Sequence, residues 1–247
     1  MDILYIVGKG SHHDNMELRF SLRSICKYGQ NIGKVIIAGT PPDWLSKEAV
    51  QVCCSDPFSY KHSNILRCIE NVVDNGIVSG DFLYSSDDHF YVKDTDFGNY
   101  PYYIKSDKLR DSVTSSDRFF KYHKSLVDTR AILLKHHLPA KNYSQHCNTH
   151  MHAEIIREFR SLIHATYKLR FGAEPTSIIM NAWSTKPGFP KVTPRNDVKI
   201  DYADNIEDFY RRIGDREAFS IGDAIFNGLV LRELFMTEFP DKCVFEM

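Results

Sequence analysis

The first 95 residues alternate short apolar segments with amphipathic ones, and this alternation constrains the fold more than any other feature. The apolar segments have the length of strands and cover residues 2–7, 34–38, 50–53 and 81–84. Runs with no polar face, such as KVIIA at 34–38, are typical of strands buried on both sides of a parallel sheet. Residues 16–28 and 64–74 have helical periodicity, and 44–48 fits a short helix. This order predicts an α/β fold with a mostly parallel sheet.

The pattern changes after Asp94. Helices are expected at about 124–137, 152–169 and 221–237, and the Pro/Gly-rich stretch 186–195 is expected to be a loop. The chain of 247 residues is therefore interpreted as a single domain. Its first half, 1–95, would be an α/β unit, and its second half, 96–247, helical and irregular and packed on that sheet.

Charge and composition exclude several classes of protein. The formal net charge of −1 argues against a strongly basic nucleic-acid coat, although a local basic patch stays possible. The sequence has no apolar run of about 18 residues, so no transmembrane helix is expected. The N-terminus reads as a first strand and not as a signal peptide, and the six cysteines lack CxxC spacing. These features favour a cytoplasmic location with reduced thiols.

The segment GDFLYSSDDHFYVKD, residues 80–94, places two carboxylates between apolar stretches. Asp87 and Asp88 follow a predicted strand, and ligands of parallel sheets bind beyond the carboxyl ends of the strands. Adjacent carboxylates there would suit Mg²⁺ or Mn²⁺. The alternative, a solvated turn after the strand, is equally compatible with the sequence.

Other candidates each have a simpler structural interpretation. Lys61 precedes a predicted helix that Ser63 or Asn64 could cap, and the same helix start could bind an anion. Arg19 and Arg23 lie four residues apart on one helical face. They could hold a diphosphate or, on spacing alone, form an ordinary solvated face with Glu17.

Histidines and a serine–aspartate pair complete the set of candidates. His146, His150 and His152 surround Cys147 without a known zinc spacing, so one imidazole completing a carboxylate site is the more plausible use. In FSIGDAIF, residues 219–226, Ser220 is expected to cap a helix with Asp223 in its first turn. Alternatively, Asp223 points into the cleft as a base or ligand.

Several segments together resemble the Stealth family of transferases. DILYIVGKGS and NMELRFSLRSICKYGQNIGKVIIAGTPPDWL are similar to its first conserved region, and FLYSSDDHF is similar to its second. NYSQHCN resembles the third region, FSIGDAIF loosely resembles the fourth, and FPDKCVFE is similar to the ending of related short proteins from phages and capsule loci. The resemblance is strongest at residues 2–45 and 82–90.

The resemblance implies a GT-A-like glycosyltransferase, with a nucleotide-binding α/β sheet and a carboxylate metal site. Asp88 and His146 would bind Mn²⁺ or Mg²⁺, and Asp87 and Asp223 would be the catalytic residues. The donor contacts implied are Asp2, Arg19, Arg23, Lys61, Asn64 and Asp87. The donor would be a nucleotide sugar, most simply a UDP-sugar.

The acceptor would be a surface glycan or, in a phage, a hydroxymethylated base in DNA within the host cytoplasm. A local DNA-binding face could be formed by Lys105, Lys108, Arg110, Arg118, Lys121 and Lys124. Two alternatives remain open. The chain could transfer sugar 1-phosphate in capsule synthesis, or it could bind nucleotide sugars without catalysis.

Overall fold

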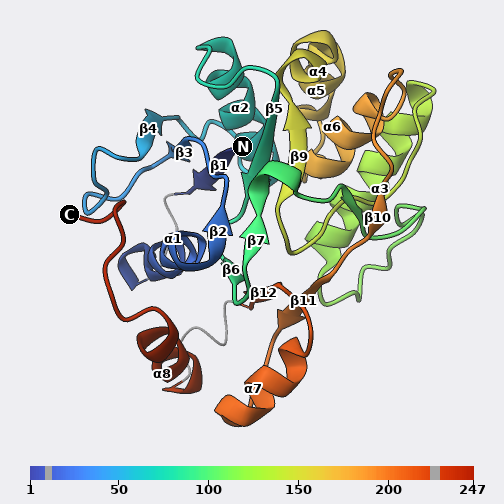
Figure 1. The fold of residues 1–247 in the computed structure, drawn as a ribbon. Helices are drawn as coiled ribbons and strands as arrows, with labels where there is room; N and C mark the ends of the chain where they lie inside the picture. Colours follow the sequence, from blue (N-terminus) through green and yellow to red (C-terminus); the bar gives the residue numbers. More distant parts are fainter. Residues whose placement is uncertain (9–12, 223–228) are drawn as a thin grey trace.

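The protein is a mixed α/β structure built on a five-stranded sheet, seen in a computed structural model that describes residues 1–8, 13–222 and 229–247 (Figure 1). The strand order is β4-β3-β1-β5-β9. β1, β3, β4 and β5 are parallel, and β9 pairs with β5 in the antiparallel direction. The predicted α/β class and mostly parallel sheet are confirmed.

The first half contains the strands β1 (Asp2–Val7), β2 (Gly29–Gln30), β3 (Val35–Gly39), β4 (Val50–Cys53), β5 (Asp81–Ser85), β6 (His89–Tyr91) and β7 (Thr95–Asp96), with the helices α1 (Met16–Tyr28) and α2 (Lys61–Asp74). The second half contains β8 (Tyr103–Ile104), α3 (Phe120–Lys135), β9 (Thr149–His152), α4 (Ala153–Glu158), α5 (Arg160–Thr166), α6 (Pro175–Trp183), β10 (Thr193–Pro194), β11 (Asp197–Ile200), α7 (Ile206–Ile213), β12 (Ala218–Ile221) and α8 (Leu229–Glu238). Two short 3₁₀ turns, His13–Asn15 and Phe97–Asn99, complete the described elements.

Both faces of the main sheet are covered, which explains the apolar runs of β1 and β3. Ile3 and Tyr5 of β1 pack with α1 on one face, whereas Leu4 packs with α2, α4 and α6 on the other. Successive strand residues point to opposite faces, so each face has its own core cluster. A third cluster joins α7 and α8 to a smaller sheet of order β11-β12-β6. Within the described part of the chain, no helix is long and apolar enough to cross a membrane.

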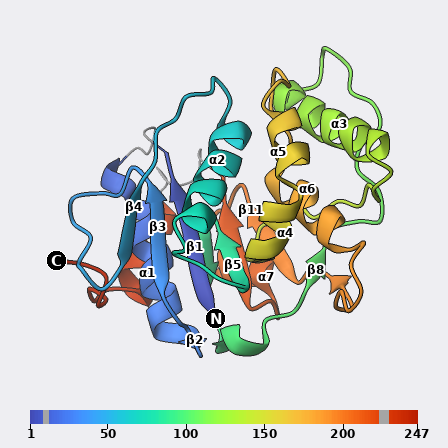
Figure 2. The same ribbon diagram turned by 90° about the horizontal axis from the view of Figure 1, so that it is seen from above.

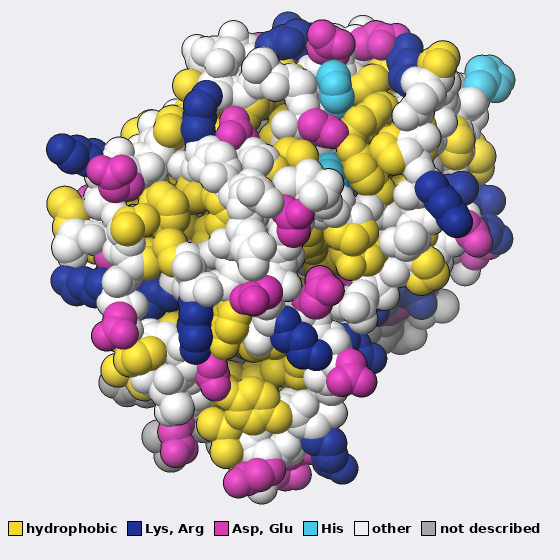
Figure 3. Space-filling view, in the orientation of Figure 1, with side chains coloured by type: hydrophobic (Ala, Val, Ile, Leu, Met, Phe, Trp, Pro, Cys, Tyr) yellow, Lys and Arg dark blue, Asp and Glu magenta, His cyan; other side chains and the backbone are white. Residues whose placement is uncertain are grey.

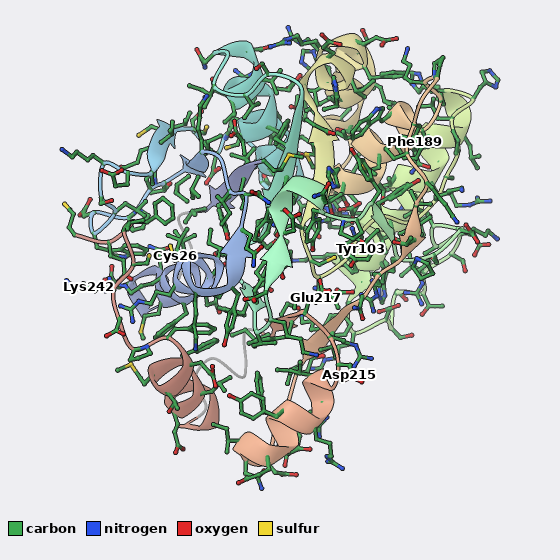
Figure 4. All side chains as sticks on the ribbon, viewed as in Figure 1. Cys26, Tyr103, Phe189, Asp215, Glu217 and Lys242 are labelled. Carbon is green, nitrogen blue, oxygen red and sulfur yellow. The ribbon has the colours of Figure 1, made fainter. Side chains whose placement is uncertain are left out.

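The C-terminal tail runs beside α1 and returns to the loop after β3 (Figure 4, in which Cys26 of α1 and Lys242 of the tail are labelled). Leu45 forms an isolated bridge with Glu246, and the Ser46 N–H donates to the carbonyl of Phe245 at 2.9 Å. The short helix expected at 44–48 was wrong, because this segment pairs with the tail instead of closing helical hydrogen bonds.

Three other expectations for the elements need correction. α2 begins at Lys61 after Tyr60, so neither Ser63 nor Asn64 caps it. The helix expected at 152–169 is two helices, α4 and α5, preceded by strand β9. Ser220 lies in β12 and does not cap a helix, and Asp223 lies outside the described residues.

Candidate active site at the carboxyl end of β5

The chain leaves the main sheet after β5 in a turn that carries the two adjacent carboxylates. Ser86, Asp87 and Asp88 form this turn, and β6 begins directly after it in the smaller sheet. The Ser86 N–H donates to Nδ1 of His89 at 3.4 Å, which ties the turn to the start of β6. The Asp88 side chain is 25% exposed. The turn therefore presents carboxylate oxygens at the edge where ligands of parallel sheets bind.

The direction of β9 brings a second segment to the same edge. Because β9 is antiparallel to β5, the residues just before β9 lie beside those just after β5. His146 and Asn148 are in this segment, since Thr149 pairs with Tyr84. The His146 N–H donates to Oδ2 of Asp197 at 2.7 Å, which links the segment to the start of β11. The structure thus places His146 at the same edge as the Asp87–Asp88 turn.

Two histidines next to the turn, His89 buried and His146 half-buried, are held neutral. Burial lowers the pKa of His89 to about 4, against the smaller opposing effects of Asp197 and Asn148. Burial lowers the pKa of His146 to about 2, and Lys199, Lys105, Arg195 and the protonated form of His89 lower it further. A neutral imidazole can ligate a metal, whereas a pKa this low makes it a poor proton acceptor at neutral pH.

Three cations from separate elements surround this edge, and we refer to Lys105, Arg195 and Lys199 as the cation cluster. Lys105 follows β8, Arg195 follows β10, and Lys199 lies in β11. Burial and the other two cations lower the pKa of Lys105. Asp197 balances part of this charge, with Oδ1 at 3.4 Å from Nε of Arg195. A cluster of this charge is suited to hold phosphate oxygens.

Several buried polar atoms at this edge have no hydrogen-bond partner among the described residues. Asn148 is fully buried beside the His89 ring, yet neither its amide oxygen nor its amide nitrogen has a partner of good geometry. The Ser220 hydroxyl, on the β12 residue paired with His89, is likewise unpartnered. Buried polar atoms are normally hydrogen-bonded, so these atoms mark a place where a ligand or water would be accommodated.

A hollow of about 240 Å³ lies along the same edge, at the ends of β1 and β3. It is lined by Gly8, Asp14, Asn15 and the residues 40–43. Gly39 precedes it with a φ of +109°, and a Cβ there would lie 2.2 Å from the Val7 carbonyl oxygen, so only glycine fits. The hollow extends the candidate site from β5 across β1 to β3.

Figures 1 and 2 together orient this edge. The parallel strands run from the bottom to the top of Figure 2, so their amino ends face the viewer in Figure 1 and the candidate site lies on the far side. The face nearest the viewer carries acidic and basic side chains intermixed (Figure 3). The face that Figure 3 shows therefore has no region of one charge sign comparable to the cation cluster.

Three of the sequence-predicted donor residues are used elsewhere in the structure. Asp2 lies at the amino end of β1, and its Oδ1 accepts from the Lys34 N–H at 2.8 Å. The Asn64 amide makes two hydrogen bonds of 2.9 Å to the backbone of Phe58. Arg23 forms an ion pair with Glu246 of the C-terminal tail.

Arg19 is partly exposed and makes three contacts. Its guanidinium lies 4.5 Å from the Trp44 ring centroid, 3.3 Å from Asp14 and 3.7 Å from Glu246. Asp14 lines the hollow, so Arg19 borders it. Lys61 is exposed at the start of α2, on the other face of the sheet but at the same carboxyl edge. These two residues remain compatible with a donor role, whereas Asp2 lies at the opposite edge.

The six residues of the predicted DNA-binding face do not form one set of free cations in the structure. Lys105 belongs to the cation cluster, whereas Lys108, Arg110 and Lys124 form ion pairs with Asp111, Asp117 and Asp128. Arg118 and Lys121 are exposed. Sequence reasoning missed Arg195, Asp197 and Lys199, although the alternation in DVKI at 197–200 is a period-2 strand signal.

In the described part of the chain, no group of three or more His, Cys, Asp or Glu residues is arranged to hold a metal ion. The donor set is still chemically suitable, because Asp87 and Asp88 supply hard oxygen ligands from one turn. Mg²⁺ commonly takes one or two carboxylates and completes its shell with water and substrate phosphate. The turn fits that kind of site and not an all-protein cage.

No protein-family model matches the sequence, and no curated protein matches it closely enough to show a relationship.

Proposed function

We propose that this chain is a metal-dependent glycosyltransferase that moves a sugar from a nucleotide sugar to an acceptor hydroxyl. The proposal rests above all on the position of the Asp87–Asp88 turn at the carboxyl end of β5. The GT-A-like character of the fold and the Stealth resemblance are part of the same proposal. The order β4-β3-β1-β5-β9, with the hollow and the turn on one edge, supports it.

The two ends of the site would bind different parts of the donor. The nucleoside would occupy the hollow beside β1 and β3, near Arg19, and the diphosphate would extend toward the turn. A divalent cation bound by Asp88, with His146 as a neutral additional ligand, would neutralise charge on the leaving diphosphate. The cation cluster would hold phosphate oxygens and stabilise the charge that develops as the sugar–phosphate bond breaks.

Proton transfer is assigned to carboxylates and not to the histidines. The depressed pKa values of His89 and His146 make both rings weak bases at neutral pH. Asp87 therefore remains the candidate within the described residues for accepting the proton of the acceptor hydroxyl. Asp223, the other candidate base, lies outside them.

A second function is transfer of sugar 1-phosphate from the same donor. The observation that favours it is the cation cluster, because three cations around one edge could hold a transferred phosphoryl group as well as a leaving diphosphate. The nucleotide product separates the two reactions. Simple glycosyl transfer releases a nucleoside diphosphate, whereas sugar-phosphate transfer releases the monophosphate.

The test is isothermal titration of UDP-sugars and other nucleotide sugars, with and without Mn²⁺, followed by identification of the nucleotide released. Asp88→Ala is compared with Asp94→Ala, which removes an exposed carboxylate six residues further along. Metal-dependent binding that is lost only in Asp88→Ala supports the proposal. Failure of every nucleotide sugar to bind, with or without metal, would refute the donor assignment.

A further inference from the structure

Aromatic rings from three segments far apart in the sequence pack together, from the buried His62 to the exposed Phe119. The segments are 56–62, before and in the first turn of α2, 117–123, at the start of α3, and 167–171, after α5. We call this region the aromatic surface. Its ring contacts, given as centroid distances, are Tyr60–Phe171 at 5.9 Å, Phe120–Phe171 at 6.0 Å, Tyr60–His62 at 5.1 Å, His62–Tyr122 at 6.2 Å and Phe119–His123 at 6.0 Å.

One ring of this surface is exposed to an unusual extent for a phenylalanine. Phe119 is 57% exposed, and the Arg118 guanidinium lies over its ring at 5.2 Å from the centroid. Arg170 lies over Phe171 at the same distance. Most large aromatic side chains are buried, so an exposed ring on a surface with further aromatic residues indicates a contact site.

The charge of the aromatic surface is strongly unbalanced. Its three segments carry five exposed cations: Lys61, Arg118, Lys121, Lys168 and Arg170. None of the five forms an ion pair with a carboxylate of the described residues. The segments contain only two carboxylates, Asp56 and Asp117, and Asp117 is already paired with Arg110 at 2.8 Å and His123 at 2.7 Å. The surface is therefore complementary to a polyanion.

The aromatic surface is continuous with the candidate active site. The Tyr122 hydroxyl is 2.6 Å from the Ser144 hydroxyl, two residues before His146. Burial raises the pKa of Tyr122 to about 12, and Arg195 of the cation cluster is among the charges that act on it. A chain bound on the aromatic surface would thus lead toward the Asp87–Asp88 turn.

We propose that the aromatic surface binds single-stranded nucleic acid and that this nucleic acid is the acceptor. The binding itself does not depend on the proposed transferase activity, and only the acceptor role rests on it. Proteins that bind single strands combine cations that follow the phosphates with aromatic rings on which bases stack. An anionic polysaccharide could use the cations, but it offers no aromatic base to the exposed ring of Phe119.

A second exposed ring elsewhere in the chain provides a matched control. Tyr202 is 58% exposed, and the Arg212 guanidinium lies 5.6 Å from its centroid. Arg212 is paired with Asp208 at 2.8 Å, and the Tyr202 hydroxyl donates to Asp204. This ring–guanidinium pair has the same exposure but lies among carboxylates, so a polyanion should avoid it.

The experiment is fluorescence anisotropy with a labelled oligothymidylate of about 16 nucleotides and an abasic strand of equal length, in EDTA and without donor. We expect the oligothymidylate to bind about tenfold more tightly than the abasic strand. Phe119→Ala should lose that advantage and leave abasic binding unchanged, whereas Tyr202→Ala should behave as wild type. The double variant Arg118→Ala, Lys121→Ala should bind both strands more weakly, and its affinity should depend less on the salt concentration.

The proposal would be overturned if the wild type bound the two strands equally. It would also be overturned if Phe119→Ala preferred the oligothymidylate over the abasic strand as strongly as the wild type does. A third contrary result would be that polygalacturonate displaces the labelled strand as well as unlabelled oligothymidylate does at equal charge. That result would indicate an anionic glycan as the ligand. Because the assay contains neither metal nor nucleotide sugar, its failure leaves the proposed donor chemistry untouched. Conversely, failure of every donor titration leaves this assay unaffected.

Discussion

Arg23 of α1 and Glu246 of the C-terminal tail form a two-pronged ion pair across 223 residues of sequence. Nε of Arg23 lies 2.6 Å from Oε1 of Glu246, and Nη2 lies 2.8 Å from Oε2. Both side chains are largely withdrawn from water, with 9% and 1% exposed. A third Arg23 nitrogen donates to the Phe239 carbonyl at 2.8 Å. Arg23, which the sequence suggested as a diphosphate ligand, instead fixes the tail to α1.

Removing Arg23 should therefore destabilise the protein severely. Burial raises the pKa of Glu246, but Arg23, the Cys243 N–H and Arg19 together outweigh burial and keep the pKa low. Without Arg23 a buried carboxylate loses its partner, which typically costs about 3–5 kcal/mol. We expect Arg23→Ala to lower the free energy of unfolding by about this amount in a urea titration monitored by circular dichroism.

A double variant separates the cost of an orphaned charge from the value of the pair. Arg23→Met with Glu246→Leu removes both charges and should recover most of the stability lost in Arg23→Ala. Lys108→Ala breaks an exposed pair with Asp111 and should leave the urea midpoint unchanged. An Arg23→Ala variant as stable as wild type would show that the tail is not held by this pair.

The protonation of His146 gives a second prediction, on the pH dependence of activity. Its pKa is lowered to about 2, mainly by burial and then by neighbouring positive groups. The ring therefore stays neutral from pH 5 to 8, and no limb of the activity profile in this range should belong to it. If it ligates the metal, His146→Asn should weaken metal affinity by about 10- to 100-fold without changing the profile's shape. A limb near pH 6 that disappears in His146→Asn would contradict this.

The first half of the fold was predictable from sequence because its elements are periodic and locally determined. β1 and the amphipathic α1 have the bounds expected from their patterns, and β3 has the expected length but begins and ends one residue later. The Asp87–Asp88 turn and His146 share the edge that strand polarity predicts for ligands. Local signals suffice where a strand is buried on both faces or a helix has one apolar face.

The second half was less predictable, because its strands depend on partners distant in sequence. β9 consists of THMH, a polar sequence that is typical of a loop, and it is a strand because it pairs with β5. β12 was interpreted as the start of a helix, since FSIGD matches a capping signal, yet it pairs with β6 and β11. Tertiary pairing outweighs local propensity in such short segments. Arg195 and Asp197 could therefore not be assigned to the site.

A third prediction concerns stability in acid and follows from His62, which is buried in the first turn of α2. Burial, and then Lys61, lower its pKa to about 3. An unfolded histidine has a pKa of about 6.5, so below that pH the unfolded state binds a proton that the folded state does not. Stability is therefore complete above pH 6.5 and falls as the pH decreases toward 3.

Replacing His62 should make the protein less sensitive to acid. Between pH 7 and pH 5 this one ring accounts for a loss of about 2 kcal/mol, which His62→Leu should remove. The measurement is the free energy of unfolding in urea at both pH values. His136→Leu, which removes an exposed histidine, serves as the control and should keep the wild-type difference. The same loss in His62→Leu as in wild type would assign the acid sensitivity to the other buried histidines.

The last prediction addresses Asp197, which positions the histidine segment and balances the cation cluster. Its carboxylate is fully buried, accepts the His146 N–H and lies 3.4 Å from Nε of Arg195. Asp197→Asn removes one negative charge without changing the side chain's shape. Asn keeps only one oxygen, so either the His146 N–H or the Arg195 guanidinium then faces the amide NH2 instead of an acceptor. Loss of a hydrogen bond to a charged group typically costs about 1.5–3 kcal/mol, so the unfolding free energy should fall by about that amount.

Activity should respond to Asp197→Asn in a way that general destabilisation would not produce. The three cations lose their internal counter-charge, so they should attract phosphate more strongly, and KM for the nucleotide sugar should fall or stay constant. The turnover number should decrease, because a single amide oxygen cannot serve both the His146 N–H and Arg195, and the two segments are then held together less firmly. Asp215→Asn, on an exposed carboxylate labelled in Figure 4, should change neither value. A raised KM with an unchanged turnover number would mean that Asp197 acts on donor binding alone.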